Sequence, residues 1–157
     1  MHQKINAGIV GGAGYTGGEL IRILLNHPQV TISFIHSKSN ASKPVHSVHT
    51  DLLGETPLLF TDILKTDIDV LFLCLGHGDS KTFLMNNPIP GNIKIIDLSQ
   101  DFRMQGSNPS TQGRTFVYGL PELQRESIRT AQALANPGCF ATAIQLGLLP
   151  LAKHGIA

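Results

Sequence analysis

The chain has 157 residues, of which 41% are hydrophobic and 15% charged, and its formal net charge is +1. This length and composition indicate one globular domain with a buried core and exclude a disordered chain. Because lysine and arginine form no cluster, we expect no nucleic-acid partner. Two cysteines are too few for a disulfide framework, and the N-terminal apolar stretch is too short for a signal or membrane segment. We therefore expect a soluble, cytoplasmic protein with no membrane partner and no metal site.

Short apolar runs alternate with helix-like stretches in the first part of the chain. Residues 4–10 predict a strand, and residues 15–26 predict a helix with one apolar face. Residues 30–36 are rich in β-branched side chains and predict a second strand. Residues 37–57 form a polar, irregular connection that is long enough to suggest a functional loop.

The remaining chain shows the same alternation. Residues 68–76 and 93–99 are near-continuous apolar runs, typical of strands that are buried on both faces of a parallel sheet. Between them, residues 79–85 predict a short helix. Residues 131–136 predict a further strand, and residues 140–153 predict a final helix. Strands that alternate with helices indicate an α/β fold with a mostly parallel sheet.

The stretch IVGGAGYTGGEL lies between the first predicted strand and the first predicted helix. It contains the pattern Gly12-x-Gly14-x-x-Gly17. In this pattern the first glycine permits a tight turn, the second lets the backbone approach a pyrophosphate, and the third allows close packing of helix on strand. The helix N-terminus then offers N–H groups to the phosphates. The pattern predicts a dinucleotide site in a Rossmann-type, doubly wound sheet, with a purely structural glycine turn as the alternative.

The end of the second predicted strand bears on the choice between NAD and NADP. A carboxylate there would bind the ribose 2′-hydroxyl group and repel a 2′-phosphate. No Asp or Glu occurs from Ile32 to Thr50, and residues 37–39 supply two hydroxyls and a cation. This favours NADP, although a polar turn without an acid gives the same pattern. The expected cofactor contacts are Gly11, Gly12, Ala13, Gly14, Tyr15, Thr16, Gly17, Ser37, Lys38, Ser39, Gly76 and His77.

Cys139 follows Pro137 and Gly138 and precedes the last predicted helix. A thiol at a helix start faces free backbone N–H groups and the positive end of the helix dipole, which favour the thiolate. Gly138 leaves room for an incoming acyl group. Free cysteines are mostly buried and unreactive, and we interpret Cys74, in mid-strand, in this way. For Cys139, position alone leaves both interpretations open.

The stretch NPGCFATA (136–143) resembles the active-site signature of the N-acetyl-gamma-glutamyl-phosphate reductase family, in the semialdehyde dehydrogenase superfamily. Four further blocks resemble the family in the same order: GIVGGAGYTGGELIRILLNHPQV (8–30), SKSNASKPVHSVH (37–49), IIDLSQDFRM (95–104) and VYGLPEL (117–123). This chain departs from the family in two places. Where the family usually has Leu-Pro-His-Gly, this chain has Leu75-Gly76-His77-Gly78, so Gly76 replaces the proline. The chain also has Gly12-Ala13 where Ala-Thr is commoner.

The resemblance implies an NADPH-dependent reductase of arginine biosynthesis that acts on an acyl phosphate. Cys139 would attack N-acetyl-glutamyl 5-phosphate and form a thioester, which NADPH would reduce to N-acetylglutamate 5-semialdehyde. Arg103 and Asn136 would contact the substrate, because a guanidinium group fits a phosphate bidentately. A surface salt bridge is the alternative role for Arg103. We expect the acidic residues Asp97 and Asp101, together with Ser99, to shape the loop around Arg103.

The general acid/base that such a reaction requires is most often a histidine. We interpret His49 and three others as surface or loop residues, and His154 is too far along the last helix from Cys139. The resemblance implies that this histidine comes from a following α+β substrate and dimerisation domain. We therefore expect residues 1–157 to be a fragment: the NADP-binding domain, ending at the cysteine helix, of a homo-oligomer. We also expect an exposed apolar patch where the missing part would pack.

Three alternatives remain open at this stage. An aspartyl-phosphate reductase is disfavoured by the Asn-Pro-Gly-Cys-Phe context around Cys139. An aminoadipyl-type reductase is harder to exclude, because the absent domain would select the substrate. A non-enzymatic, NADP-sensing module is the third, and the reactivity of Cys139 toward iodoacetamide would separate it from an enzyme.

Overall fold

The computed structural model describes residues 4–104 and 111–156 of the chain. Its strands are β1 (Ile5–Val10), β2 (Val30–His36), β3 (Phe60–Thr61), β4 (Val70–Leu73), β5 (Lys94–Asp97), β6 (Phe116–Tyr118) and β7 (Ala133–Ala135). Its α-helices are α1 (Tyr15–Leu25), α2 (Asp79–Asn86), α3 (Pro121–Thr130) and α4 (Cys139–Lys153). The connection after β2 contains three short 3-10 helices, η1 (Lys38–Asn40), η2 (Val45–Ser47) and η3 (Thr50–Leu52).

The described strands form one seven-stranded sheet in the order β3-β2-β1-β4-β5-β7-β6, and every neighbouring pair is parallel. The chain runs outward from β1 to β3 in one direction and then from β4 in the other. The carboxyl ends of β1 and β4 therefore form the point where the strand order reverses, which is where ligands bind in doubly wound sheets. The predicted α/β, Rossmann-type fold is confirmed.

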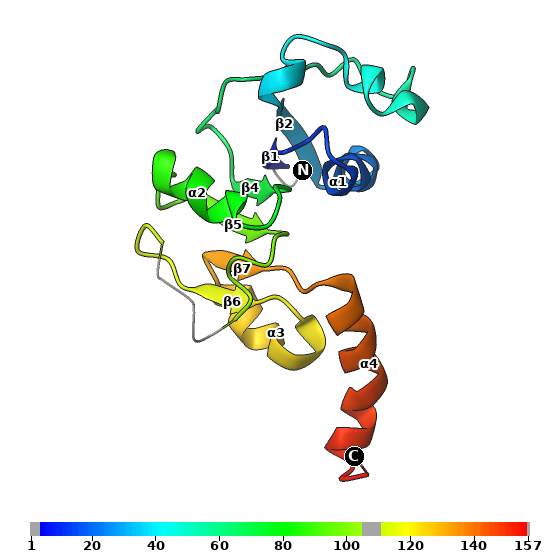
Figure 1. Cartoon of the computed structure of the whole chain (residues 1–157), viewed down its shortest axis with the longest axis vertical. Helices are drawn as coiled ribbons and strands as arrows, with labels where there is room; N and C mark the ends of the chain where they lie inside the picture. The colour runs from blue at the N-terminus through cyan, green and yellow to red at the C-terminus, as the bar shows by residue number, and fades with distance from the viewer. Residues whose placement is uncertain (1–3, 105–110, 157) are drawn as a thin grey trace.

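Helices α1 and α2 lie on opposite sides of this sheet (Figure 1). On one side, Ile21 and Leu24 of α1 belong to a buried cluster with the side chains of β1 and β2 that face them. On the other side, Leu84 of α2 packs in a second cluster that extends to Phe116 of β6. Successive residues of a strand point to opposite faces, so strands covered on both faces carry apolar residues at nearly every position. This explains the continuous apolar runs in the sequence.

Most predicted elements are confirmed to within a few residues, and three elements were missed. Strand β3 has two residues and β6 has three, too few to show a period-two pattern. Helix α3 has no buried residue, so it carries no apolar stripe, although Pro121 at its first turn is a helix-start signal. The strand predicted over 68–76 is shorter, because its last residues leave the sheet at the turn before α2.

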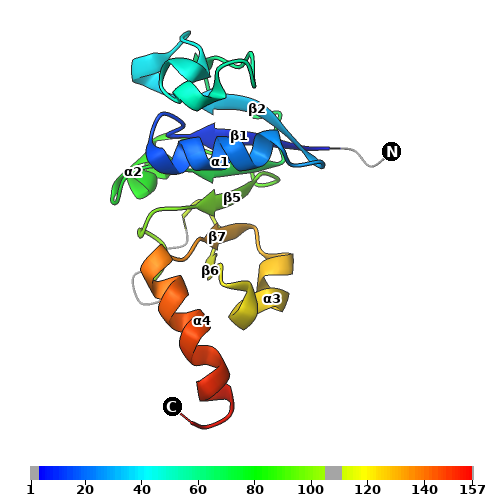
Figure 2. The same ribbon diagram turned by 90° about the vertical axis from the view of Figure 1, so that its right-hand side faces the viewer.

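Helix α4 extends away from the sheet (Figures 1 and 2). It has no buried residue, and the exposed fractions of Phe140, Ile144 and Leu148 are 78%, 45% and 51%. The expected exposed apolar patch is therefore present on this helix. None of the helices in the described ranges combines the length and the hydropathy that crossing a membrane requires.

Candidate active site at the carboxyl ends of the strands

The glycine loop between β1 and α1 owes its shape to three close approaches. Gly11 has φ +81°, and a Cβ atom there would lie 2.4 Å from the carbonyl oxygen of Cys74. A Cβ atom on Gly12 would lie 2.2 Å from Ile35 Cγ2, and one on Gly17 would lie 2.5 Å from the carbonyl oxygen of Gly11. Gly12 lies inside the predicted tight turn, which the bond from the Gly14 N–H group to the Gly11 carbonyl oxygen closes (3.2 Å). The residue with the positive φ is Gly11, which precedes this turn and also requires glycine.

The N-terminus of α1 is open and uncharged. Gly14 is its N-cap residue, no side chain caps the helix, and the first turn contains no acidic residue. A Cβ atom on Gly14 would meet only the carbonyl oxygen of Gly11, at 3.6 Å, so this side of the loop faces open space. Tyr15 is 97% exposed, and Ala13 and Thr16 also reach the surface. Free N–H groups beside an uncrowded backbone fit the pyrophosphate of a dinucleotide.

Two separate cavities lie along this edge of the sheet. The larger, of about 850 Å³, borders Cys139. The smaller, of about 510 Å³, lies at the end of β2 and is lined by Gly11, by residues 37–39 and by α2. Ser37 is 8% exposed, and Lys38 and Ser39 belong to η1. Among the described residues, Asp79 of α2 is the one acid that lines the smaller cavity. The predicted 2′-phosphate residues and Gly11, the first residue of the glycine loop, thus border one space.

His36, the last residue of β2, connects the glycine loop to the smaller cavity. Its carbonyl oxygen accepts hydrogen bonds from the backbone N–H groups of Gly11 (3.1 Å) and Gly12 (3.2 Å). Its side chain is 7% exposed and lies edge-on to Phe83 of α2. Burial, and then the neighbouring Lys38, lower the pKa of its imidazole. A neutral, buried ring therefore supports the lining of the smaller cavity.

Cys139 is the first residue of α4, and its side chain is exposed. The larger cavity beside it is lined by residues from several segments that are far apart in the sequence, including Thr16, His77, Arg103 and Asn136. These come from the start of α1, the turn after β4, the loop after β5 and the end of β7. The parallel strands bring them together because the carboxyl ends of all these strands share one edge. Gly76 is exposed beside His77 but does not line this cavity.

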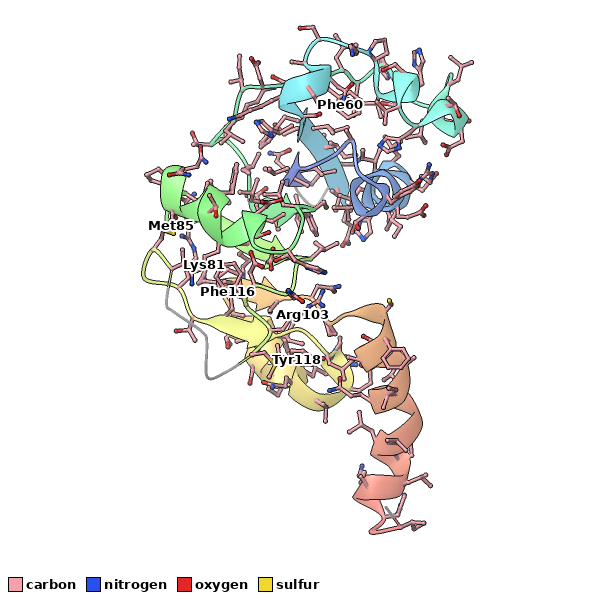
Figure 3. All side chains as sticks on the ribbon, in the orientation of Figure 1. Phe60, Lys81, Met85, Arg103, Phe116 and Tyr118 are labelled. Carbon is pink, nitrogen blue, oxygen red and sulfur yellow. The ribbon has the colours of Figure 1, made fainter. Side chains whose placement is uncertain are left out.

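Arg103 connects the loop after β5 to the turn that leads to Cys139 (Figure 3). Its Nε atom donates to the carbonyl oxygen of Asn136 (2.9 Å), and its Nη2 atom donates to that of Leu98 (2.8 Å). No ion pair of Arg103 occurs within residues 4–104 and 111–156. The alternative of a surface salt bridge is therefore wrong, because the side chain binds backbone carbonyls instead. Its guanidinium also fills the space beside Gly138.

The loop that carries Arg103 is held by the residues expected to shape it. The buried carboxylate of Asp97 accepts a hydrogen bond from the Ser99 hydroxyl (2.7 Å). The Asp101 carboxylate accepts from the backbone N–H groups of Gly78 (2.6 Å) and Lys81 (3.0 Å). Asp101 therefore caps α2 from outside the helix. An acid closes the N-terminus of α2, whereas that of α1 stays open.

The other cysteine and the histidines differ in their surroundings. Cys74 is buried, and burial, together with the charge of Asp97, raises the pKa of its thiol to about 12, which confirms it as a structural cysteine.

Among the described histidines, only His77 lines the Cys139 cavity, and its Nδ1 atom accepts the N–H of Gln100 (3.2 Å). His154 lies at the opposite end of α4. His49 lies in the connection between β2 and β3, as expected of a loop residue, but it is not a surface residue, because it is only 8% exposed.

A sequence profile described as "Semialdehyde dehydrogenase, NAD binding domain" matches residues 6–131. The chain belongs to this family. The match covers the glycine loop, the smaller cavity and Arg103, and the NAD-binding description agrees with the open N-terminus of α1.

The semialdehyde dehydrogenase domain has close relatives among curated proteins. It is 55% identical over 152 residues to the N-acetyl-gamma-glutamyl-phosphate reductase of Christiangramia forsetii, covering 97% of this chain and 46% of that protein. It is 58% identical over 151 residues to the protein of the same name from Parabacteroides distasonis, covering 96% and 45%. The chain therefore spans about half the length of the curated relatives it matches.

A solved structure with the same fold is that of aspartate semialdehyde dehydrogenase with NADP from Candida albicans. The TM-score is 0.67 at 14% sequence identity, over 99% of this chain and 48% of that one. At this identity the likeness concerns the fold alone. It agrees with the doubly wound sheet of the semialdehyde dehydrogenase domain.

The structure also brings residues to the site that the sequence reasoning missed or left without a role. The turn between β6 and α3, with the first two residues of α3 (residues 119–122), lines the Cys139 cavity, and so does Thr142 of α4. The hydroxyl of Tyr118 donates to Oε1 of Gln145 (3.1 Å), so β6 contacts α4 directly (Figure 3). The block VYGLPEL marked this segment in the semialdehyde dehydrogenase domain. Neither its strand nor its helix was predicted.

Proposed function

We propose that this chain is the cofactor-binding and cysteine-bearing part of an NADPH-dependent reductase of N-acetyl-glutamyl 5-phosphate. One observation carries the proposal: an exposed cysteine begins a helix beside Arg103, on the same sheet edge as an open glycine loop. The name of the relatives that are 55% and 58% identical supports this substrate. The product would be N-acetylglutamate 5-semialdehyde, in arginine biosynthesis.

The chemistry divides among this chain's own groups. The Cys139 thiolate attacks the acyl carbon of the substrate, the carbon–oxygen bond to phosphate breaks, and inorganic phosphate leaves. Cys139 begins α4, and no side chain caps this helix, so backbone N–H groups of its first turn stay available beside the reacting carbon. When bound, NADPH supplies the hydride that reduces the resulting thioester. The carbon–sulfur bond then breaks, which releases the aldehyde and returns the thiolate.

Arg103 is suited to the phosphate of the substrate. Nε and Nη2 each donate to a backbone carbonyl, and these two bonds hold the guanidinium plane still. The N–H groups of Nη1 and the second one of Nη2 remain for phosphate oxygens. Asn136 contributes to the same region, because its carbonyl oxygen anchors Arg103 and its side chain is exposed to the cavity.

NADPH is our preferred cofactor because of the chemistry at the end of β2. Ser37, Lys38 and Ser39 border the smaller cavity, and a cation with two hydroxyls suits a 2′-phosphate. The first carboxylate after β2 is Asp51, which is paired with Arg22 and is not among the residues that line this cavity. Lys38→Glu is expected to reverse the preference between NADPH and NADH, measured as dissociation constants.

We infer that the acid/base histidine and the homo-oligomer contacts come from a part of the protein outside the matched half of its relatives. His77 is the only described histidine at the Cys139 cavity, and its Nδ1 atom already accepts a backbone hydrogen bond. The apolar face of α4 offers a surface for such a part. Both cysteines are free, which suits the reducing cytoplasm.

The deciding experiment joins residues 1–157 to the remaining C-terminal part of the Parabacteroides distasonis relative. The chimera is assayed for NADPH oxidation with N-acetyl-glutamyl, N-acetyl-aminoadipyl and aspartyl phosphates. We expect turnover of the first, loss of turnover in Cys139→Ser, and retained turnover in Cys74→Ser. An acyl adduct mapped to Cys139 would support the mechanism. Turnover that survives Cys139→Ser would contradict it, and preference for another acyl phosphate would correct the substrate.

A further inference from the structure

The connection between β2 and β3 returns to the glycine loop through one buried histidine. His49 lies just before η3, and its side chain is 8% exposed. Its Nε2 atom lies 2.7 Å from the carbonyl oxygen of Gly12. A carbonyl oxygen only accepts hydrogen bonds, so Nε2 carries the proton and donates. A side chain 37 residues away in the sequence thus satisfies a backbone group of the loop.

The imidazole of His49 is confined on two sides. A Cβ atom on Gly18 of α1 would lie 2.6 Å from its Cε1 atom and 2.7 Å from its Nδ1 atom. The ring lies against the helix where only glycine leaves room for it. Phe60 of β3 lies on another side, with ring centroids 6.3 Å apart and a tilt of 56°. Packing therefore holds the Nε2 atom toward Gly12.

The same connection is attached to α1 by a second contact. Arg22 binds the Asp51 carboxylate through Nε (2.6 Å) and Nη2 (2.7 Å). At its other end, the connection begins with residues 37–39, directly after the His36 carbonyl that accepts the N–H groups of Gly11 and Gly12. Gly12 is therefore held through its N–H by the end of β2 and through its carbonyl by His49.

We propose that His49 is a positioning residue for the cofactor. It holds the glycine loop in register with the segment 37–39, so that the pyrophosphate and 2′-phosphate regions keep a fixed separation. This inference rests on the proposed NADPH function. His49 lines neither of the two cavities, and it acts through Gly12 and the connection it belongs to.

The test compares two variants of the 157-residue chain. Phenylalanine in His49→Phe keeps the ring shape but leaves the Gly12 carbonyl without its donor. Glutamine in His49→Gln offers an amide N–H at a similar reach. We expect His49→Phe to weaken NADPH binding about tenfold, whereas His49→Gln stays within about threefold of the native value. Dissociation constants are measured by NADPH fluorescence, below the melting temperature of each variant. His46→Phe, in the same connection and partly exposed, is the matched control.

A second measurement needs no cofactor. Amide hydrogen exchange of peptides that cover residues 11–18 reports how firmly the loop is held. We expect faster exchange there in His49→Phe and native exchange in His49→Gln and His46→Phe. If His49→Phe does not fold, His49→Asn replaces it, because its shorter amide does not reach Gly12.

The outcomes separate the inference from the proposed function. Native NADPH affinity and native exchange in a folded His49→Phe would overturn the positioning role. An equal loss of NADPH affinity in His49→Phe and His49→Gln would overturn it too, because a hydrogen-bond donor to the Gly12 carbonyl would then make no difference. A native chain that fails to bind NADPH would contradict the proposed function, while the exchange data would still decide whether His49 holds the loop.

Discussion

The Nη1 atom of Arg103 lies 2.8 Å from the position that a Cβ atom would take on Gly138, the residue before Cys139. Gly138 has an ordinary φ of −69°, so glycine is required here by the arginine and not by the backbone. A side chain on residue 138 would therefore clash first with the guanidinium of Arg103.

Gly138→Ala is therefore expected to displace the guanidinium and break its bonds to the carbonyls of Asn136 and Leu98. We expect the free energy of unfolding to fall by about 1–2 kcal/mol, measured by urea denaturation. The penalty should shrink when Arg103→Ala is already present, because the two substitutions then share one cause. Gly147→Ala in α4 is the control. A Cβ atom there meets nothing within 4 Å, so alanine should stabilise the helix by up to about 1 kcal/mol.

The two cysteines are expected to differ sharply toward iodoacetamide. Cys139 is exposed, whereas Cys74 is buried and its thiol has a pKa of about 12. At pH 8 only about one Cys74 thiol in ten thousand would be ionised, so the native chain should be labelled at Cys139 alone. Peptide mapping by mass spectrometry checks this. Labelling of Cys74 without denaturation would show that the sheet opens, and a Cys139 that resists labelling would favour a sensing module over an enzyme.

The buried carboxyl of Asp97 makes the free energy of unfolding depend on pH. Burial raises the pKa of its carboxyl, and the hydroxyls of Ser80 and Ser99 oppose part of that shift. Because the pKa of Asp97 is raised in the folded state, the protonated carboxyl favours folding. Its contribution to the free energy of unfolding is complete below the unfolded pKa of 3.8 and is lost as the pH rises through the folded pKa. Asp97→Asn removes this ionisation and keeps an acceptor for Ser99.

We expect Asp97→Asn to be at least as stable as the native chain at pH 7, with an advantage that shrinks as the pH falls toward 4. Urea denaturation between pH 4 and 8 measures the difference. Asp97→Ala is the comparison, because it removes the acceptor of the Ser99 O–H group at every pH. An advantage of Asp97→Asn that grows on acidification would show that the ionised carboxylate stabilises the fold.

Arg114 fastens the segment before β6 to the chain between α2 and β5. It is 5% exposed, and its guanidinium donates to the carbonyl oxygens of Ile89 (3.2 Å) and Ile93 (3.1 Å) and to that of Pro90. Lysine cannot reproduce this planar set of donors, so Arg114→Lys should lower the free energy of unfolding by about 2 kcal/mol.

Arg129→Lys provides the matched control for Arg114. The Arg129 side chain is 71% exposed and pairs only with Glu126 among the described residues, at 3.6 Å. We expect its replacement to change the free energy of unfolding by less than about 0.5 kcal/mol. Equal effects of the two substitutions in urea denaturation would mean that the buried bonds of Arg114 contribute little.

The sequence by itself determined the features that depend on neighbouring residues. Apolar runs marked the buried strands, helical spacing marked α1 and α4, and the order of glycine and cysteine marked a loop and a helix start. These signals are local, because strand and helix periods repeat over a few residues. Position in the chain was enough to predict that Cys139 begins a helix and that Cys74 is buried.

Only the tertiary structure decided the features that depend on contacts between distant segments. Which glycine takes the positive φ depends on the Cys74 carbonyl beside Gly11. The burial of His49 depends on the space over Gly18, and one partner of Arg103, the carbonyl of Asn136, comes from the end of β7. Strand β6 exists because β7 pairs with it. No local pattern encodes such contacts, since their energy arises only when the parallel sheet brings the strand ends together.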